Sequence, residues 1–364
     1  MRILYVLPKY YPNIGGSGIH VKNLAERLAK KHDVSIFVPT RLHGLARHEE
    51  VEGVEVRRFW CLAPHDAYYF SPPIGDAVFR SDADIVHMHG YYDLLPAIVI
   101  LSKNSFEKCL FTLHSGGAFS RVSEMLHWPY NIGMGTIIKR RVNKVIYVSK
   151  SEQRHFQNLW QLPQSRIELI PNGVNVSRLY QSSYKRADPP IILSAARLEK
   201  YKGHHVVIEA FRLFKKAHPE SKAKLVILGR GTYEDQLREQ VHVSGVSDAV
   251  SFLGWLPDGE YYDLMKSCAM FLLLSDHEAH PIAVAEAIAA MKPVIVTIRP
   301  GLDDFVGEGN AVGIPYPPSA VKVAEIIQEV LRDPGSYIPR NRRILSWDDV
   351  AARVEELYKD SLQN

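Results

Sequence analysis

Two glutamates, Glu278 and Glu286, stand with seven residues between them where a buried strand is expected to pass into a helix. The apolar run 270–274 precedes them, and an apolar helical pattern starts at Ile282 and Ala283. Carboxylates at such a junction can reach a ligand at the carboxyl edge of a parallel sheet, while the first helical turn offers unpaired backbone N–H groups and a positive dipole end to phosphates. The pair therefore predicts a nucleotide-binding site. The alternative is two ordinary acids beside a helix start, where acidic residues are common.

Two cations follow the strand expected at 191–195. Arg197 and Lys202 lie just beyond its carboxyl end, and Gly203 opens the next helix. Cations at this place can neutralise a diphosphate. The alternative is that both are solvated surface charges.

A glycine-rich segment, Gly15-Gly16-Ser17-Gly18, precedes the first expected helix, where glycine allows a ligand to approach the backbone and permits a positive φ. A dinucleotide fingerprint requires G-x-G-x-x-G directly after the strand, but Val21 stands at the third glycine position and residues 8–14 separate strand from loop. Thr40 and Arg41 stand where an acidic ribose ligand is expected. These mismatches argue against NAD and leave either another ligand or a plain turn.

Histidines occur at two of the expected strand ends. His277-Glu278-Ala279-His280 matches a zinc-protease motif only in part, because Pro281 occupies the place of the second histidine, so no metal site is predicted there. His114 ends the strand expected at 110–114 and would look into a cleft between domains. Taken alone, a structural, hydrogen-bonded histidine is the other interpretation.

The bulk composition is that of a globular protein with two domains. The chain has 364 residues, of which 46% are hydrophobic and 23% charged, enough for a large core. An excess of four basic over acidic residues, without a nucleic-acid motif, argues against a nucleic-acid partner. The cysteines Cys61, Cys109 and Cys268 form no Cys-x-x-Cys pair, which fits a reducing, cytoplasmic compartment.

Neither a signal peptide nor a membrane span is expected. The apolar run 3–7 is too short for a signal peptide and has the length of a buried strand. The longest apolar stretch, 94–101, is interrupted by Pro96 and falls short of the roughly 20 residues that a span requires.

Apolar strand patterns alternate with helical patterns along the chain, which predicts parallel sheets covered on both faces. The expected strands are 3–7, 34–38, 85–89, 110–114, 144–148, 191–195, 224–228, 250–253, 270–274 and 293–297. The expected helices are 19–31, 205–217, 233–243, 261–267, 283–290 and 347–362.

The polar stretch 181–190 has the composition of a linker and sets the predicted domain boundary. The expected domains are an N-terminal one, 1–180, and a C-terminal one, 181–346, each Rossmann-like. The terminal helix within 347–364 either closes the protein locally or packs back on the first domain.

Taken in order, several segments resemble the retaining glycosyltransferases of family 4, which use nucleotide-activated sugars. The matching segments are Gly15-Gly16 with His20 and the helix 24–29, the strand and turn 145–149, the segment 170–174, Arg197 with Lys202-Gly203, the strand and turn 226–231, and Glu278 through Glu286. The resemblance spans most of the chain and draws its specificity from the shared order. It implies the α/β GT-B fold, in which two Rossmann-like domains with parallel sheets face an interdomain cleft.

The resemblance also implies a role for each site residue. Arg197 and Lys202 would hold the donor diphosphate and stabilise it as leaving group, Glu286 would bond the ribose, and Glu278 would face the transferred sugar. His114 would orient that sugar or stabilise charge beside it. The remaining implied donor-binding positions are Gly15, Gly16, Asn172, Gly229, Ile282 and Ala283. Fixed cations and helix-end amides meet the charge on the phosphate, so neither a metal nor another cofactor is expected.

The implied partners are a nucleotide sugar of GDP-mannose or UDP-glucose type in the second domain and a glycan or lipid-linked acceptor in the first. The alternatives are a nucleotide-sugar epimerase on the same fold and a non-catalytic nucleotide-sugar binder. The segment 137–144, preceded by Trp128, Tyr130 and Met134, predicts either a contact with the inner surface of an anionic membrane or a solvated helix face. No sequence feature indicates an oligomeric state.

The chain departs from the family pattern at three places. It has Ala279-His280-Pro281 where Gly-Phe-Gly is common, Met291 where glycine precedes the next strand, and Ser115 where Asp often follows the histidine. These departures bear on the identity of the hexose, or on a weakened or lost activity. Pro281 is compatible with a helix start.

Overall fold

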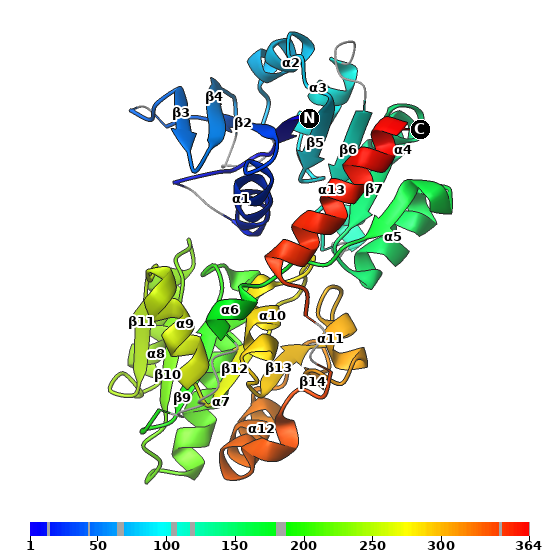
Figure 1. Ribbon diagram of the computed structural model, residues 1–364. Helices are drawn as coiled ribbons and strands as arrows, with labels where there is room; N and C mark the ends of the chain where they lie inside the picture. Colours follow the sequence, from blue (N-terminus) through cyan, green and yellow to red (C-terminus); the bar gives the residue numbers. More distant parts are fainter. Residues whose placement is uncertain are drawn as a thin grey trace. The chain divides into compact units, whose positions relative to one another are not determined.

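The computed structural model describes residues 1–12, 15–42, 44–63, 69–102, 108–116, 121–179, 187–341 and 344–363, without the side chains of residues 121–127. The chain forms two compact units, Met1–Gly173 with Trp347–Asn364, and Val174–Ser346 (Figure 1). Each unit has its own sheet and its own apolar core.

The sheet of the first unit is parallel except for one antiparallel pair. Its strands are β1 (Arg2–Val6), β2 (Asp33–Thr40), β3 (His48–Val51), β4 (Val54–Trp60), β5 (Ile85–His89), β6 (Lys108–Thr112), β7 (Lys144–Tyr147) and β8 (Ile167–Leu169). Its helices are α1 (Gly16–Leu28), α2 (Pro72–Phe79), α3 (Leu95–Leu101), α4 (Arg121–Arg141), α5 (Lys150–Trp160), η2 (Gln164–Arg166) and α13 (Trp347–Gln363). The strand order is β3-β4-β2-β1-β5-β6-β7-β8, and β3 and β4 are the antiparallel pair.

The sheet of the second unit is parallel throughout. Its strands are β9 (Ile191–Ala195), β10 (Lys224–Leu228), β11 (Val250–Leu253), β12 (Met270–Leu273), β13 (Val294–Thr297) and β14 (Val312–Ile314). Its helices are α6 (Val176–Leu179), η3 (Lys200–Lys202), α7 (His204–Ala217), α8 (Glu234–Val243), α9 (Asp258–Ser267), α10 (Ile282–Ala289), α11 (Asp303–Gly307), α12 (Ala320–Arg332) and η4 (Pro334–Tyr337). The strand order is β11-β10-β9-β12-β13-β14.

The predicted strands and helices are confirmed, with ends shifted by a few residues. Their apolar patterns were strong because parallel strands are buried on both faces, as in β12, where every residue is apolar and buried. The strands β3, β4, β8 and β14 were not predicted. In the antiparallel edge strand β3, three of the four residues are polar and most are exposed.

In both sheets one strand marks the point where the chain order reverses. In the second sheet β9 lies between β10 and β12, and in the first sheet β1 lies between β2 and β5. The loops that leave the carboxyl ends of such neighbouring strands diverge and leave room for a ligand. The segments after β9 and β12 are those that carry Lys202 and Glu278.

The two units divide after Gly173, ahead of the linker predicted at 181–190. Val174 pairs with Ser346 in a parallel bridge, and Val174 and Leu179 are buried in the core of the second unit. A pairing between residues so distant in sequence is not visible in local composition. Residues 181–186 of the expected linker lie outside the described residues.

The terminal helix α13 packs in the first unit, beside α1 (Figure 1). Tyr358 Oη lies 2.6 Å from His87 Nδ1, and Arg27 forms an ion pair with Asp348 at 2.7 Å. Of the two arrangements expected for this helix, the structure has the one in which it packs on the first sheet. No helix within the described ranges is long and apolar enough to cross a membrane.

Candidate active site

An ion pair between Lys202 and Glu278 joins the segments that follow β9 and β12. Lys202 Nζ lies 2.5 Å from Glu278 Oε1, and the two side chains are only 11% and 10% exposed. Ser275 Oγ donates a hydrogen bond to the same carboxylate oxygen at 2.7 Å. Because β9 and β12 are neighbours at the reversal point, residues 76 positions apart meet at one sheet edge.

Two glycines allow the loops at this edge of the sheet to pack closely against each other. Gly203 has a φ of 76°, and a Cβ there would lie 2.1 Å from the Leu274 carbonyl oxygen. Gly229 has a φ of 140°, and its Cβ would lie 2.0 Å from the Ala196 carbonyl oxygen. Only glycine permits both this conformation and this approach. Gly203 thus lets the turn carrying Lys202 pack on the end of β12, while Gly229, a predicted donor-binding residue, packs against the loop after β9.

Arg197 lies on the same edge, held by an aromatic ring. Its guanidinium donates to Tyr201 Oη at 2.5 Å, and Lys202 Nζ lies 5.0 Å from the centre of the Tyr201 ring. The His277 ring stacks on the ring of Tyr201, with centroids 4.5 Å apart and planes 10° apart. Burial lowers the pKa of His277, so this stack adds no further positive charge at neutral pH. The two predicted phosphate-binding cations are therefore neighbours.

Glu286 lies on α10 in buried surroundings. Tyr261 Oη donates a hydrogen bond to Glu286 Oε2 at 2.5 Å. Burial raises the pKa of Glu286 to about 7, although the bond from Tyr261 opposes this rise. The carboxyl group is thus poised to gain or lose its proton near neutral pH.

The start of α10 has the geometry expected of a helix that offers free N–H groups. Pro281 is the residue before the helix, and its carbonyl oxygen accepts the first helical hydrogen bonds, from Val284 and Ala285 at 3.2 Å each. The N–H groups of Ile282 and Ala283 stand ahead of this ladder. The other departure, Met291, lies past the opposite end of α10 with a φ of 61°, where glycine is usual. Met291 therefore strains the helix end rather than the Glu278 end.

In the first unit His114 follows β6 in a strained conformation. Its φ is 52°, which is uncommon for residues other than glycine. The next N–H group, of Ser115, donates to Glu152 Oε1 at 2.5 Å, and the N–H of Val148 donates to Glu152 Oε2 at 2.7 Å. Burial raises the pKa of Glu152 to about 8, against the effect of the two N–H groups. The carboxyl group of Glu152 thus fixes the backbone beside His114.

Glu152 was not among the predicted site residues, although the sequence carried a signal for it. Ser149 and Glu152 have the S-x-x-E spacing of a capping box, and Ser149 Oγ accepts from the Glu152 N–H at 3.1 Å. In the usual capping box the glutamate side chain turns back to the cap residue. Here it bonds Ser115 and Val148 instead, which depends on the neighbouring position of β6 and β7.

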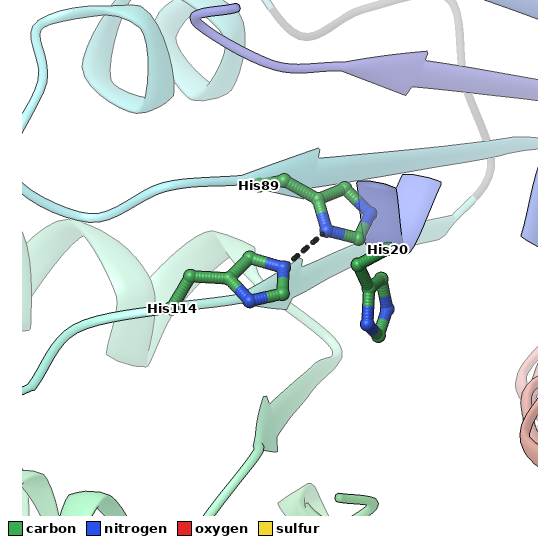
Figure 2. Close-up of side chains that lie close together, drawn as sticks. All are labelled: His20, His89 and His114. Carbon is green, nitrogen blue, oxygen red and sulfur yellow. Dashed lines mark hydrogen bonds between the residues drawn. The ribbon is translucent and has the colours of Figure 1, made fainter. Parts of the chain in front are cut away.

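His114 belongs to a cluster with His20 on α1 and His89 at the end of β5 (Figure 2). His89 Nδ1 lies 3.0 Å from His114 Nε2, and His20 Nδ1 lies 2.8 Å from Asn172 Oδ1. Burial lowers the pKa of all three histidines, to about 4 for His20. Asn172, a predicted donor-binding residue, therefore has a direct partner in the first unit.

The glycine-rich segment differs in detail from its prediction. The helix α1 already begins at Gly16, and Gly15 before it has a φ of −124°, so the positive φ that glycine permits is not used there. A Cβ at Gly15 or Gly16 would meet no described atom within 4 Å. Packing within the described chain therefore gives no reason for glycine at these two positions.

Each half of the sequence matches a different family model. Residues 14–178 match Glycosyltransferase Family 4, and residues 177–344 match Glycosyl transferases group 1. An uncharacterised glycosyltransferase of Methanocaldococcus jannaschii is 27% identical across 100% of this chain and 99% of its own length. A GDP-mannose:cellobiosyl-diphosphopolyprenol alpha-mannosyltransferase of Xanthomonas campestris is 28% identical across 82% of this chain and 80% of its own.

The fold is similar to that of a solved GT-B enzyme. Sucrose-phosphate synthase from Thermosynechococcus elongatus matches with a TM-score of 0.79 over 99% of both chains, at 19% identity. The two family models together extend from residue 14 to residue 344. The chain belongs to the family 4 glycosyltransferases and has their GT-B fold.

Proposed function

We propose that the protein is a retaining enzyme that moves a hexose from a nucleotide sugar to a hydroxyl group of a glycan or lipid-linked acceptor. The observation that carries this proposal is the Lys202–Glu278 ion pair, with Arg197 beside it, at one edge of the second sheet. The name of the Xanthomonas campestris relative contains a GDP-mannose donor and a diphosphopolyprenol acceptor, which supports both substrate classes. A UDP-glucose type donor fits the same charges.

The diphosphate of the donor would bind to Arg197 and Lys202. In the structure Lys202 is neutralised by Glu278, and a diphosphate would compete for the same ammonium group. As the bond from sugar to phosphate breaks, negative charge grows on the leaving oxygen, and fixed cations stabilise it. The N–H groups of Ile282 and Ala283 supply further partial positive charge at the start of α10. These groups suffice for the charge, so we expect no metal or other cofactor.

The two glutamates would then have separate tasks. Glu278, released from Lys202, would accept hydrogen bonds from the hydroxyl groups of the hexose. Glu286 would accept from the ribose hydroxyl groups, and its ionised form is the better acceptor. Tyr261 holds this carboxylate in place.

The first unit would bind the acceptor and would contribute the side chain of His114. In a retaining reaction that proceeds on one face of the sugar, the departing phosphate oxygen helps to remove the proton from the acceptor hydroxyl. A neutral imidazole at His114 would orient the sugar without repelling charge that develops there. Gly15 and Gly16, where space is open beside the backbone, would admit the phosphates.

The test is product analysis with defined acceptors in the presence of EDTA. The protein is incubated with GDP-mannose or UDP-glucose and either an oligosaccharide or a short-chain polyprenyl-diphosphate sugar, and the first product is examined by NMR. The proposal expects an α-linked product from an α-linked donor. A β-linked product, or a changed nucleotide sugar formed without acceptor, would contradict it. Donor binding without any turnover would identify a non-catalytic binder instead.

We expect the enzyme in the cytoplasm, and a lipid-linked acceptor would bring it to the inner membrane surface. Helix α4 exposes Trp128 and Ile132, which are 62% and 51% exposed, and ends in the basic segment 139–141. The rest of the predicted surface faces inward, since Met134 is buried and the Tyr130 hydroxyl donates to backbone carbonyl groups. We therefore expect a small contact that depends on anionic lipid. Flotation with neutral and anionic liposomes measures it, and equal flotation with both would remove the idea.

A further inference from the structure

Three histidines from separate segments converge at the carboxyl edge of the first sheet (Figure 2). One nitrogen from each of His20, His89 and His114 lies within 4.8 Å of the other two. We propose that this cluster binds a divalent transition metal of borderline softness, such as Zn²⁺, and that the bound metal blocks sugar transfer rather than assisting it.

The closest pair in the cluster already has a spacing near that of metal ligands. His89 Nδ1 and His114 Nε2 are 3.0 Å apart and share one proton. Two imidazole nitrogens bound to tetrahedral zinc at its usual bond length are roughly 3.4 Å apart. A metal ion between the two rings would require the shared proton to move to the outer nitrogen of its own ring, so that both ligands stay neutral. The pair would then widen only slightly, and the third ring would need a modest rotation.

The third ligand, His20, is held in the manner of a metal-binding histidine. Its Nδ1 faces the amide oxygen of Asn172 at 2.8 Å, so Nδ1 carries the proton and Nε2 keeps its lone pair. Ligand histidines commonly donate their second N–H to such an oxygen, which fixes the ring and its tautomer. Asn172 is 4% exposed, so this support is largely shielded from water.

A buried nitrogen in the cluster also lacks a partner. His89 is 1% exposed, and its Nε2 makes no hydrogen bond with any described atom. The adjacent His87 differs, because its two nitrogens bond Tyr358 and Thr112 at 2.6 and 2.8 Å. Both nitrogens of His87 are thus hydrogen-bonded, whereas His89 bonds described atoms only through Nδ1 and can carry its proton on Nε2 when Nδ1 binds a metal.

The chemistry of the donor set decides which metal fits. Within the described residues, the group holds imidazoles without a carboxylate or thiolate, which suits zinc, cobalt or nickel and not magnesium or calcium. Three neutral ligands leave the dipositive charge of the metal intact and one position open for water or an anion. His114 is only half-buried, so a metal ion would reach the cluster from its side.

The consequence for transfer follows from His114 and rests on the proposed function. A metal that takes the His114 lone pair would remove this ring from the sugar and place a strong positive charge there. Metal binding itself does not depend on that role. The two parts are therefore measured separately.

The experiment uses the full chain without a polyhistidine tag. Zn²⁺ affinity is measured by competition with a chromophoric chelator for the wild type, His89→Asn and His20→Asn, with His48→Asn on the exposed edge strand as matched control. The wild type and the control are expected to bind one zinc ion per chain, and each cluster variant to lose affinity by about a hundred-fold or more. Asn172→Ala is expected to lose about ten-fold. Equal affinity in all variants, or no stoichiometric binding to wild type, overturns the proposal.

X-ray absorption of the zinc-loaded wild type keeps the test independent of how the variants fold. Three imidazole ligands support the site, and fewer than three overturn it. Transfer activity is then followed against free Zn²⁺, and inhibition is expected at the concentration that fills the site. If no transfer occurs under any condition, the proposed function fails while the binding result stands. If zinc binds without inhibiting, the blocking role is wrong.

Discussion

At the edge of the second sheet Lys202 and Glu278 bring opposite charges to 2.5 Å, whereas at the same edge of the first sheet His20, His89 and His114 bring neutral rings together. Both clusters lie at the carboxyl ends of strands, close to the point in each sheet where the chain order reverses. Lys202 and Glu278 face each other as an ion pair, whereas the histidines are neutral because burial disfavours their charged form. Strand order thus sets where a site lies, while the loops set whether it is charged.

The strongest challenge to this comparison removes the cation of the charged edge. Lys202→Ala is expected to lower kcat/KM by on the order of a hundred-fold or more, because a fixed donor to the leaving group is lost. Lys200→Ala, an exposed neighbour in the same short helix, serves as control and should change little. Steady-state transfer kinetics give kcat/KM for both variants. Equal values of kcat/KM would mean that the charged edge does not act on the leaving group.

The carboxyl group of Glu286 offers a pH test of the same edge. Its pKa of about 7 means that it loses its proton as pH rises through neutrality, so affinity for a nucleoside diphosphate should increase from pH 6 to pH 8. Glu286→Gln should weaken binding by roughly 10- to 100-fold and abolish this pH dependence, since a charged acceptor is lost. Tyr261→Phe removes a bond that lowers the pKa and should move the transition to higher pH. Fluorescence titrations across pH measure all three.

The neutral edge is tested through the support of His114. Glu152→Ala leaves the N–H groups of Ser115 and Val148 without their acceptor, so the strained backbone at His114 should relax. We expect kcat to fall about ten-fold with an unchanged donor Kd, and stability to fall by about 1–3 kcal/mol. Glu152→Gln, which can still accept one N–H, should recover part of kcat. A loss of donor affinity equal to the loss of kcat would show that the two edges do not act separately.

The smallest expected effect concerns Met291, which lies outside both edges. Its φ of 61° costs a non-glycine residue about 1–2 kcal/mol, so Met291→Gly should stabilise the folded state by about 1 kcal/mol. Transfer kinetics should not change, because the residue lies past the far end of α10 from Glu278. Chemical denaturation measures the free energy of unfolding. A changed preference between donors would show that this departure reaches the sugar after all.

The sequence predicted the charged edge better than the neutral one. Lys202, Glu278 and Glu286 lie beside strong apolar strands and a helix start, so their surroundings were visible locally. His89 and Glu152 became site residues only through contacts with His114 and Ser115 on other segments. Those contacts depend on the order β5-β6-β7, which local patterns do not contain.

The fold shows the same division between local and distant information. Buried parallel strands such as β12 were predicted because both of their faces are apolar. The short polar strand β3 was missed, and the unit boundary was displaced because Val174 pairs with the distant Ser346. Among the helices that were not predicted, which include α2, α3, α5 and α12, α12 has four buried residues at helical spacing, Val323, Ile326, Ile327 and Val330, so its pattern was present in the sequence.

The most direct measurement is a calorimetric titration of the full chain with GDP-mannose and UDP-glucose, first in EDTA and then with Mg²⁺, for the wild type, Glu286→Ala and Glu152→Ala. If the charged edge of the second unit holds the donor, one nucleotide sugar binds equally with and without Mg²⁺. Its affinity then falls in Glu286→Ala and persists in Glu152→Ala. Binding that survives in Glu286→Ala, or that requires Mg²⁺, would contradict the account.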